Sequence, residues 1–317
     1  MVRLFLGNRA GVLFLLPFVI GGYFALNNLT GYYLPEKTIN LGLWGESVRV
    51  YPLMAAILAS VIIFINAISI NWIYNSNEFL ERNSYLSSLL YVILMSFYHS
   101  FYSVDGLLLA HTFLILTMAQ FFKLNQHEDG RRNIFNGMFF AGIAATFHPP
   151  LMVIFPFLCF MFWVLRPFVF REFFLALIGF GIPLLYSFIY LWYSNHEINL
   201  KLLDQVTDYR NKQTDFLVTA LLFTLLSILS VFSIRSRMQK SSIRLKKLTS
   251  IIWWYLFVAL GLGVLDFILF RQIERFSFMM IALAIFLTFS FTSKTFSIIA
   301  TALFYLTLGY SFTKFFF

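Results

Sequence analysis

The side chains that could do chemistry in this chain are ionisable residues near the ends of long apolar segments. On one side of the predicted membrane these are Glu36, Glu46, Arg49, His99, Asp105, His148, Asp266, Arg271, Glu274 and Arg275. Ionisable groups are costly near hydrocarbon, so they usually face the interior of a helix bundle or a water-filled cavity. Their gathering predicts a polar site that opens to the extracytoplasmic face. Charges are also best tolerated at helix ends, so a structural role is the alternative.

Individual residues of this set carry the same pair of alternatives. His148 precedes two prolines, where its imidazole could ligate a metal, contact a phosphate, or cap the broken helix by binding a freed carbonyl. Asp105 opens an apolar segment, where a carboxylate suits helix capping and catalysis equally. Asp266 could pair with an arginine from the same helix end. The sharper interpretation is that Arg271 and Arg275 hold a lipid phosphate.

The histidines form no recognisable metal motif. His99, His111 and His148 could be imagined as ligands of a non-haem iron, since imidazole suits iron, but no spacing signature connects them. His127 and His196 fall in loops on opposite sides. We therefore expect hydrogen-bonded histidines inside the bundle, and the sequence identifies no metal.

The amino-acid composition indicates that membrane-spanning segments position these residues. Of 317 residues, 60% are hydrophobic and only 12% are charged. A typical soluble domain is about half apolar and a quarter charged, so soluble enzymes, disordered tails and fibrous proteins are excluded. The excess of 23 Lys and Arg over 14 Asp and Glu is typical of loops that meet anionic membrane lipids, and no nucleic-acid partner is expected. The single cysteine, Cys159, excludes a disulfide framework.

Most of the chain divides into apolar segments of about 17 to 25 residues, which is the length that crosses a bilayer as a helix. The first follows Arg3 and Arg9 and is interpreted as a retained span, because no small-x-small cleavage site follows it. The expected spans cover residues 11–26, 50–74, 84–101, 105–122, 173–193, 216–234, 250–270, 276–293 and 295–316. The fold class is therefore an all-α polytopic membrane bundle, in a single transmembrane domain over residues 1–317.

Residues 134–165 form an apolar stretch of roughly 32 residues, about 48 Å as one helix, which is too long for one span. His148-Pro149-Pro150 lies in its middle, and two prolines break a helix. We predict a short hairpin hinged at this tripeptide, which brings the total to about eleven helices. This reversal places about 15 of the 23 basic residues on the cytoplasmic side, as the positive-inside rule requires, with the N-terminus cytoplasmic.

Two loops in the C-terminal part, residues 194–317, have a distinctive pattern. Residues 194–215 on the outer side place apolar side chains at helical spacing among charged ones, which predicts an amphipathic helix on the membrane surface. Residues 235–247 on the inner side carry six basic residues, which predicts an anchor to anionic lipids.

The sequence NGMFFAGIAATFHPP at residues 136–150, followed by an apolar half-helix and Pro156, resembles the short paired helices of GT-C type glycosyltransferases. The preceding order of helices over residues 1–193 is also similar. Enzymes of that family transfer sugars from polyprenyl-phosphate donors at the extracytoplasmic face, in some members with a divalent cation. The chain also resembles uncharacterised bacterial inner-membrane proteins, a resemblance that implies no activity. The expected location is the bacterial inner membrane, with several membrane spans.

Residue by residue, the resemblance implies a catalytic set and a substrate-binding set. Glu36 or Glu46 would match the acid of the first outer loop, and Asp105 the acid of the second. Asp105 would deprotonate or orient an acceptor hydroxyl, so its exchange for Asn is expected to abolish transfer. Arg271 and Arg275 would grip the lipid-linked phosphate, with Asp266 and His148 beside them.

Two alternatives remain open. The chain has Asn27 and Asn28 where the family usually has an acid close behind its first helix, so a donor-binding relative without catalysis fits as well. A non-catalytic membrane subunit or scaffold of a cell-envelope assembly would use the large apolar faces that 42 phenylalanines provide to bind partner proteins. A transporter would show matching helix breaks in both halves, and only the break at His148 is clear.

Overall fold

The structure, a computed structural model, describes residues 1–33, 38–39, 41–44, 48–49, 51–124, 130–165, 169–194, 213–239, 241–270, 273–292 and 297–316. Within these residues the α-helices are α1 (Val2–Phe5), α2 (Leu16–Thr30), α3 (Pro52–Ser76), α4 (Leu86–Met95), α5 (Gly106–Lys123), α6 (Arg131–Phe147), α7 (Phe155–Leu165), α8 (Phe170–Tyr193), α9 (Gln213–Met238), α10 (Ile243–Phe270), α11 (Met279–Thr292) and α12 (Ser297–Thr313). The all-helical fold class is confirmed: the twelve described α-helices are the expected eleven and the short α1.

Short 3₁₀ segments and one small strand pair connect these helices. The 3₁₀ segments are η1 (Ala10–Leu15), η2 (Gly42–Trp44), η3 (His99–Phe101), η4 (Pro149–Ile154) and η6 (Glu274–Phe278). Strands β1 (Thr38–Ile39) and β2 (Val48–Arg49) pair antiparallel, with Thr38 opposite Arg49. The expected helix over 84–101 is shorter than predicted, because α4 ends at Met95 and the chain turns into η3. The expected amphipathic helix at 194–215 falls largely outside the described residues.

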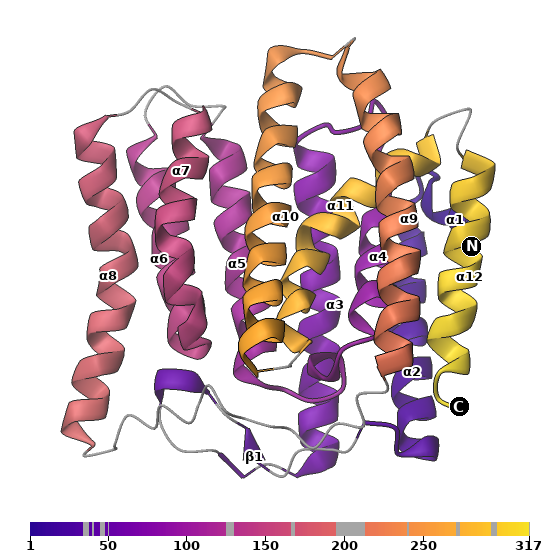
Figure 1. The fold of residues 1–317 in the computed structure, drawn as a ribbon, viewed down its shortest axis with the longest axis horizontal. Helices are drawn as coiled ribbons and strands as arrows, with labels where there is room; N and C mark the ends of the chain where they lie inside the picture. The colour runs from indigo at the N-terminus through magenta and orange to yellow at the C-terminus, as the bar shows by residue number, and fades with distance from the viewer. Residues whose placement is uncertain are drawn as a thin grey trace.

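The longer helices lie side by side, and successive ones run in opposite directions (Figure 1). The chain reverses between α6 and α7, which confirms the predicted hairpin. His148 leaves the helical conformation, with φ −134° and ψ 90°, as a residue before proline is expected to do. We call the end of the bundle that carries this reversal the hinge end, at the bottom of Figure 1, and the opposite end the basic end.

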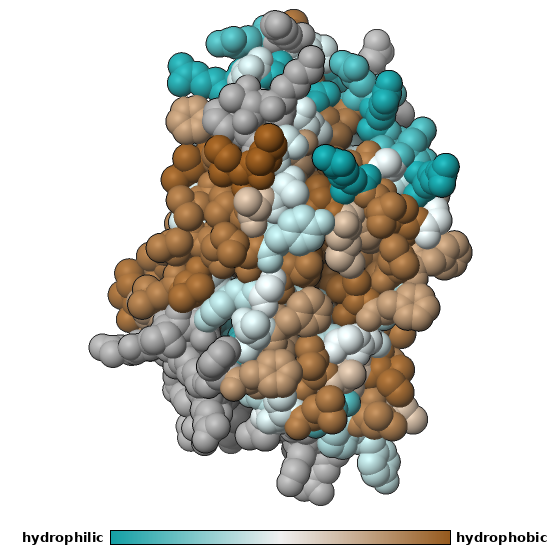
Figure 2. Space-filling view, turned by 90° about the vertical axis from the view of Figure 1, so that its right-hand side faces the viewer, coloured by the Kyte–Doolittle hydropathy of each residue, from teal (hydrophilic) through white to brown (hydrophobic). Residues whose placement is uncertain are grey.

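The helices have the dimensions of membrane spans. Seven segments of the described chain are long and apolar enough to cross a membrane: Ala10–Thr30, Pro52–Ser76, Gly106–Lys123, Phe170–Tyr193, Leu217–Met238, Ile243–Leu269 and Glu274–Thr292. Shorter apolar helices at Leu86–Met95, Pro149–Met161 and Ser297–Thr313 lie among them. Figure 2 shows a broad hydrophobic band around the middle of one face, with hydrophilic side chains at the basic end. The protein is therefore a multi-pass membrane protein.

Two helices form the centre of the bundle. All ten residues of α4 are buried, and so is most of α11. Both are apolar on every side, which is the pattern of a helix surrounded by other helices. Helices α6 and α8 pack by close backbone approach: a Cβ atom on Gly142 would lie 2.5 Å from the Phe180 carbonyl oxygen, and one on Gly179 2.7 Å from that of Phe135. Small residues permit such contact between membrane helices.

Basic residues are unevenly distributed between the two ends. The last turn of α9 carries Arg235 and Arg237, and the first turns of α10 carry Arg244, Lys246 and Lys247. All of these belong to the basic end. At the hinge end the cationic side chains whose placement the structure describes are Arg275 and Lys314, and each is mostly or fully buried.

Candidate functional site at the hinge end

The hinge end holds a cluster of polar side chains built around the short segment η6. Its residues Glu274, Arg275 and Ser277 each hydrogen-bond to a different part of the fold. The partners lie in η3, at the tripeptide between α6 and η4, and in α5, far away in the sequence. We call this set, which comprises His99, Ser100, Asp105, His111, His148, Asp266, Glu274, Arg275 and Ser277, the hinge-end cluster.

Arg275 lies at the centre of the hinge-end cluster. Its Nη1 forms an ion pair with Oδ1 of Asp266 from α10, and its Nε donates to Nε2 of His148 at 3.1 Å. Because Nε2 accepts this hydrogen bond, the His148 ring is neutral and carries its proton on Nδ1. The Asp266 side chain is completely buried and that of Arg275 is 12% exposed. A charge in such a place requires its partner, since the desolvation of an unpaired buried ion costs several kcal/mol.

Glu274 ties η6 to η3. Its Oε1 accepts from the backbone amide of His99 at 3.2 Å, and its Oε2 accepts from the Ser100 hydroxyl at 3.4 Å. Asp105 is close enough to act electrostatically on the Glu274 carboxyl. The two carboxyl groups therefore belong to the same polar region, although they come from segments 169 residues apart in the sequence.

Asp105 itself caps α5. Its Oδ1 accepts from the backbone amide of Leu108 at 2.6 Å, which is the geometry of an N-cap carboxylate. The capping alternative that the sequence offered for this residue is thus observed.

A chain of polar contacts continues from the hinge-end cluster into the bundle. His111 Nε2 lies 3.1 Å from the Ser277 hydroxyl, and His111 Nδ1 lies 3.5 Å from the Tyr91 hydroxyl. Asn66 of α3 donates to the same hydroxyl at 3.4 Å. The Phe278 ring stacks on His111, with centroids 4.9 Å apart, and lies 5.6 Å from the His148 ring. His111 is thus a hydrogen-bonded histidine of the core, as the sequence predicted.

The structure brings some of the predicted site residues together and leaves others untested. Arg275 is in direct contact with Asp266 and His148. Asp105 interacts electrostatically with Glu274, the residue before Arg275 in η6. Glu36, Glu46 and Arg271 lie outside the described residues. No three His, Cys, Asp or Glu side chains of the described chain are arranged to share a metal ion. The divalent cation that some members of the resembling family use, and the alternative of an iron held by histidines, therefore gain no ligand set from the described residues.

Gly263 makes the position of η6 possible. A Cβ atom at this residue of α10 would lie 2.6 to 2.8 Å from three carbons of the Phe276 ring, so the ring packs directly on the helix backbone. Gly263 precedes Asp266 by three residues, which places both on the same face of α10. The Phe276 ring therefore covers the face from which Asp266 points.

We expect Gly263→Ala to displace η6 and to lower the free energy of unfolding by about 1–3 kcal/mol, the usual range for overpacking. The measurement is thermal unfolding in detergent. Gly261→Ala is the matched control, because a Cβ atom there meets nothing within 4 Å and should cost nothing. Equal stability of the two variants would show that Phe276 does not pack on α10 as described.

A wall of aromatic rings closes one side of the cluster. The Tyr33 ring stacks on Tyr102 at a centroid distance of 4.7 Å and lies 5.9 Å from the His99 ring. The Lys314 ammonium lies 4.7 to 5.8 Å from the ring centroids of Tyr32, Tyr33, Phe97, Tyr102 and Phe315. It also donates to the backbone carbonyl of Ser96 and is 3% exposed. We call Lys314 with these five rings the lysine cage.

The first hinge-end loop is fixed to the end of α6 by η2. The Trp44 indole donates to the Thr146 hydroxyl at 2.9 Å, two residues before His148. Gly42 has φ +67°, and a Cβ atom there would collide with the backbone carbonyl oxygens of Thr146 and Phe147. Only glycine fits both constraints.

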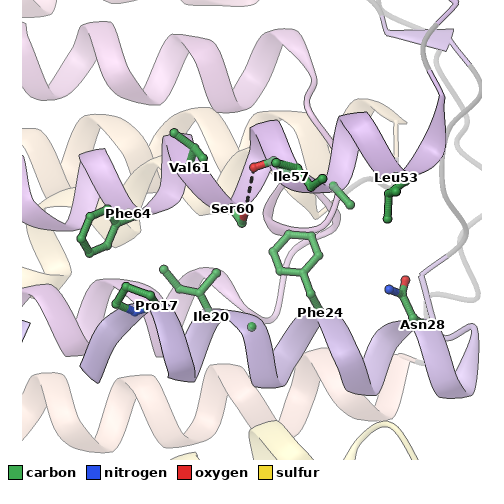
Figure 3. A pocket seen from close by; sticks show the side chains of 11 residues that line it. Pro17, Ile20, Phe24, Asn28, Leu53, Ile57, Ser60, Val61 and Phe64 are labelled. Carbon is green, nitrogen blue, oxygen red and sulfur yellow. Dashed lines mark hydrogen bonds between the residues drawn. The ribbon is translucent and has the colours of Figure 1, made fainter. Parts of the chain in front are cut away.

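An apolar groove of about 290 Å³ lies between α2 and α3, in the half of the bundle toward the hinge end (Figure 3). Pro17 and Asn28 mark its two ends on α2, a distance of about 16 Å along a helix. The Ser60 hydroxyl in the groove already donates to the Ile57 carbonyl oxygen, so it offers no free donor. The Phe24 ring in the groove wall lies 5.6 Å from the Tyr102 ring, which links the groove to the aromatic wall of the cluster.

Comparisons with known proteins assign no family to the chain. No family model, no curated protein and no solved structure matches it. The chemistry of the hinge-end cluster is therefore the basis for a function: carboxylates that can accept a proton, beside a guanidinium that can stabilise an anion.

Proposed function

We propose that the protein is a membrane enzyme that transfers a sugar from a polyprenyl-phosphate donor to a hydroxyl acceptor at its hinge end. The observation that carries this proposal is the contact of Asp266, Arg275 and His148, in which His148 is 127 residues away from Arg275 in the sequence. Ionisable groups inside a membrane bundle are rare because they are costly, and they usually mark a site. A carboxylate beside a guanidinium provides a proton acceptor and a stabiliser for a phosphate leaving group.

The orientation of the chain is part of the same proposal. The basic end carries the arginines and lysines of the α9–α10 connection, which favours a cytoplasmic location for that end. The hinge end would then face the extracytoplasmic side of a bacterial inner membrane, with the N-terminus in the cytoplasm. Polyprenyl-phosphate donors present their head groups at that face in the enzymes that the chain resembles.

The groove between α2 and α3 suits the hydrocarbon chain of such a donor. Its α3 wall is exposed on the side of the bundle, with Leu53 68% and Ile57 52% exposed. The groove runs toward the hinge end, where Asn28 is the exposed polar residue of its rim. A hydrocarbon chain in the groove would thus carry its phosphate to the membrane surface beside the aromatic wall of the hinge-end cluster.

Gly21→Leu should fill this groove. A Cβ atom at Gly21 meets nothing within 4 Å, so the protein should fold normally while the added side chain occupies the space for lipid. We expect at least a tenfold loss of co-purifying polyprenyl lipid, measured by mass spectrometry of lipid extracts. Gly309→Leu, at an exposed glycine of α12 with equally open surroundings, is the control. Retention of lipid in both variants would exclude the groove.

The experiment that tests the proposed function is native mass spectrometry of the protein purified in mild detergent. We expect bound polyprenyl phosphate, and a loss of it in Arg275→Lys, which keeps the charge beside Asp266 but not the planar guanidinium that binds phosphate. Arg244→Lys at the basic end is the matched control. A stoichiometric protein partner without such a lipid would contradict the proposal and favour the scaffold alternative.

A further inference from the structure

We propose that Asp266 is the general base of this transfer. Once Asp266 is protonated, it no longer neutralises Arg275, and the positive charge of Arg275 can stabilise the departing phosphate. This inference rests on the proposed function and identifies the residue that removes the proton. It replaces Asp105, the base that the family resemblance implies.

The assignment follows from the hydrogen bonds that each carboxylate already accepts. Both oxygens of Glu274 are engaged, by the His99 amide and the Ser100 hydroxyl. Asp105 uses Oδ1 to cap α5, at a distance of 2.6 Å that fixes the carboxyl group on the helix end. Asp266 is different, because neither of its oxygens accepts a hydrogen bond in the described chain and only Oδ1 is in the ion pair with Arg275.

Asp266 Oδ2 is a buried acceptor without a hydrogen-bond donor in the described chain. The side chain has no surface accessible to bulk solvent. A buried acceptor left without a donor costs about the free energy of a lost hydrogen bond, and such groups are rare in native structures. An acceptor hydroxyl placed at Oδ2 would supply the missing donor. The reaction would therefore begin with a hydrogen bond from the acceptor hydroxyl to Asp266 Oδ2.

The chemical step balances over the cluster and the substrates together: the cluster gains one proton, and the leaving phosphate gains one negative charge. The acceptor O–H bond breaks, its proton moves to Asp266 Oδ2, and the acceptor oxygen forms a bond to the anomeric carbon of the sugar. The bond from that carbon to the phosphate oxygen breaks, and the electron pair leaves with the polyprenyl phosphate. Protonated Asp266 no longer neutralises Arg275, so the guanidinium gains an uncompensated positive charge as the leaving phosphate gains a negative one.

His148 keeps the guanidinium in place during this change. Its Nε2 accepts from Arg275 Nε, whereas the ion pair with Asp266 uses Nη1. The hydrogen bond to His148 thus persists when the ion pair is lost. His148 is a positioning residue in this scheme. The Phe276 ring covers the same face of α10, so this side chain must turn aside, with η6 itself in place, to admit the acceptor hydroxyl to Asp266.

The test is chemical rescue of Asp266→Ala, which opens space for a small anion beside Arg275. Turnover is measured as release of polyprenyl phosphate from a panel of radiolabelled polyprenyl-phosphate monosaccharides, with water and octyl glucoside as acceptors. We expect a loss of about 100- to 10,000-fold, the usual contribution of a general base. Formate should restore part of the turnover, because it can pair with Arg275 and accept a proton. Nitrate also pairs with Arg275 but is too weak a base to accept the proton. It should therefore replace the negative charge of Asp266 without restoring turnover.

Three results would overturn the proposal. Equal rescue by nitrate and formate would show that Asp266 only neutralises Arg275. Full turnover in folded Asp266→Ala would remove it from the reaction. Loss of turnover in Asp105→Asn, where asparagine still caps α5, would return the role of base to Asp105. An absence of turnover in the wild-type protein with every donor would instead contradict the proposed function itself.

Discussion

Lys314→Glu should detach the C-terminal end of α12 from the bundle and lower the free energy of unfolding by about 3–5 kcal/mol, the cost of an uncompensated buried charge. The ammonium of Lys314 faces five aromatic rings and the Ser96 carbonyl oxygen, all of which present negative potential. A carboxylate in the same place would be repelled by each of them. The measurement is thermal unfolding in detergent, together with limited proteolysis of the C-terminus.

Lys314→Met is the control that separates charge from packing. Methionine keeps the aliphatic stem and makes favourable contacts with aromatic rings, and the Ser96 carbonyl still accepts from the Tyr102 hydroxyl at 2.8 Å. We therefore expect a much smaller change than in Lys314→Glu. If Lys314→Glu and Lys314→Met unfold at the same temperature, the sign of the charge inside the lysine cage has no effect on stability. Packing alone would then hold the end of α12 in place.

Gly42→Ala should release the first hinge-end loop from α6. The new methyl group would meet the carbonyl oxygens of Thr146 and Phe147, and backbone atoms in a helix cannot move aside cheaply. The left-handed conformation adds roughly 1–2 kcal/mol for a residue with a Cβ atom. We expect the Trp44 indole to lose its hydrogen bond to Thr146, and trypsin to cut the loop at least tenfold faster.

Gly31→Ala distinguishes the two causes. Gly31 has nearly the same conformation, with φ +63°, but a Cβ atom there meets nothing within 4 Å. This variant should show the cost of the conformation alone and should leave the loop protected from trypsin. Comparable cleavage in both variants would mean that strain, rather than collision with α6, controls the docking of the loop.

The sequence was sufficient to predict the helices because bilayer thickness constrains their length. Each expected span corresponds to a helix, and Pro149 with Pro150 marked the reversal of the chain correctly. Local rules also gave the helix cap at Asp105 as one of two alternatives, because the residue before a helix needs an acceptor for free amides, and the structure shows that cap. These features depend on neighbours within a few residues, which the sequence displays directly.

The contacts of the hinge-end cluster could be predicted only in part. An ion pair of Asp266 with an arginine of the same helix end was one of two stated alternatives, and the structure identifies the arginine as Arg275. The sequence placed Glu274 among the outer ionisable residues without a role and did not indicate Ser277, because their partners lie in η3 and α5 and no periodicity connects them. Hydropathy reports how deep a residue lies, but it does not report which helices meet side by side.

The lysine cage shows the same limit. Lys314 lies near the end of the expected span 295–316, and a lysine beside phenylalanines at a helix end is typical of a membrane interface. Its burial depends on Tyr32, Tyr33 and Tyr102, which come from other parts of the chain. A tyrosine-rich loop normally indicates an interfacial belt, and nothing in its spacing distinguishes that belt from a wall around a cation.

The long sequence separation between η6 and its hydrogen-bond partners also determines when the site can form during synthesis. Arg275 follows His148 by 127 residues, and Glu274 follows the His99 amide by 175. At the usual rates of translation, His148 is made roughly 6 to 25 s before Arg275. The helices up to α9 are therefore made before the site can assemble. The site exists only in molecules whose chain has been extended through η6.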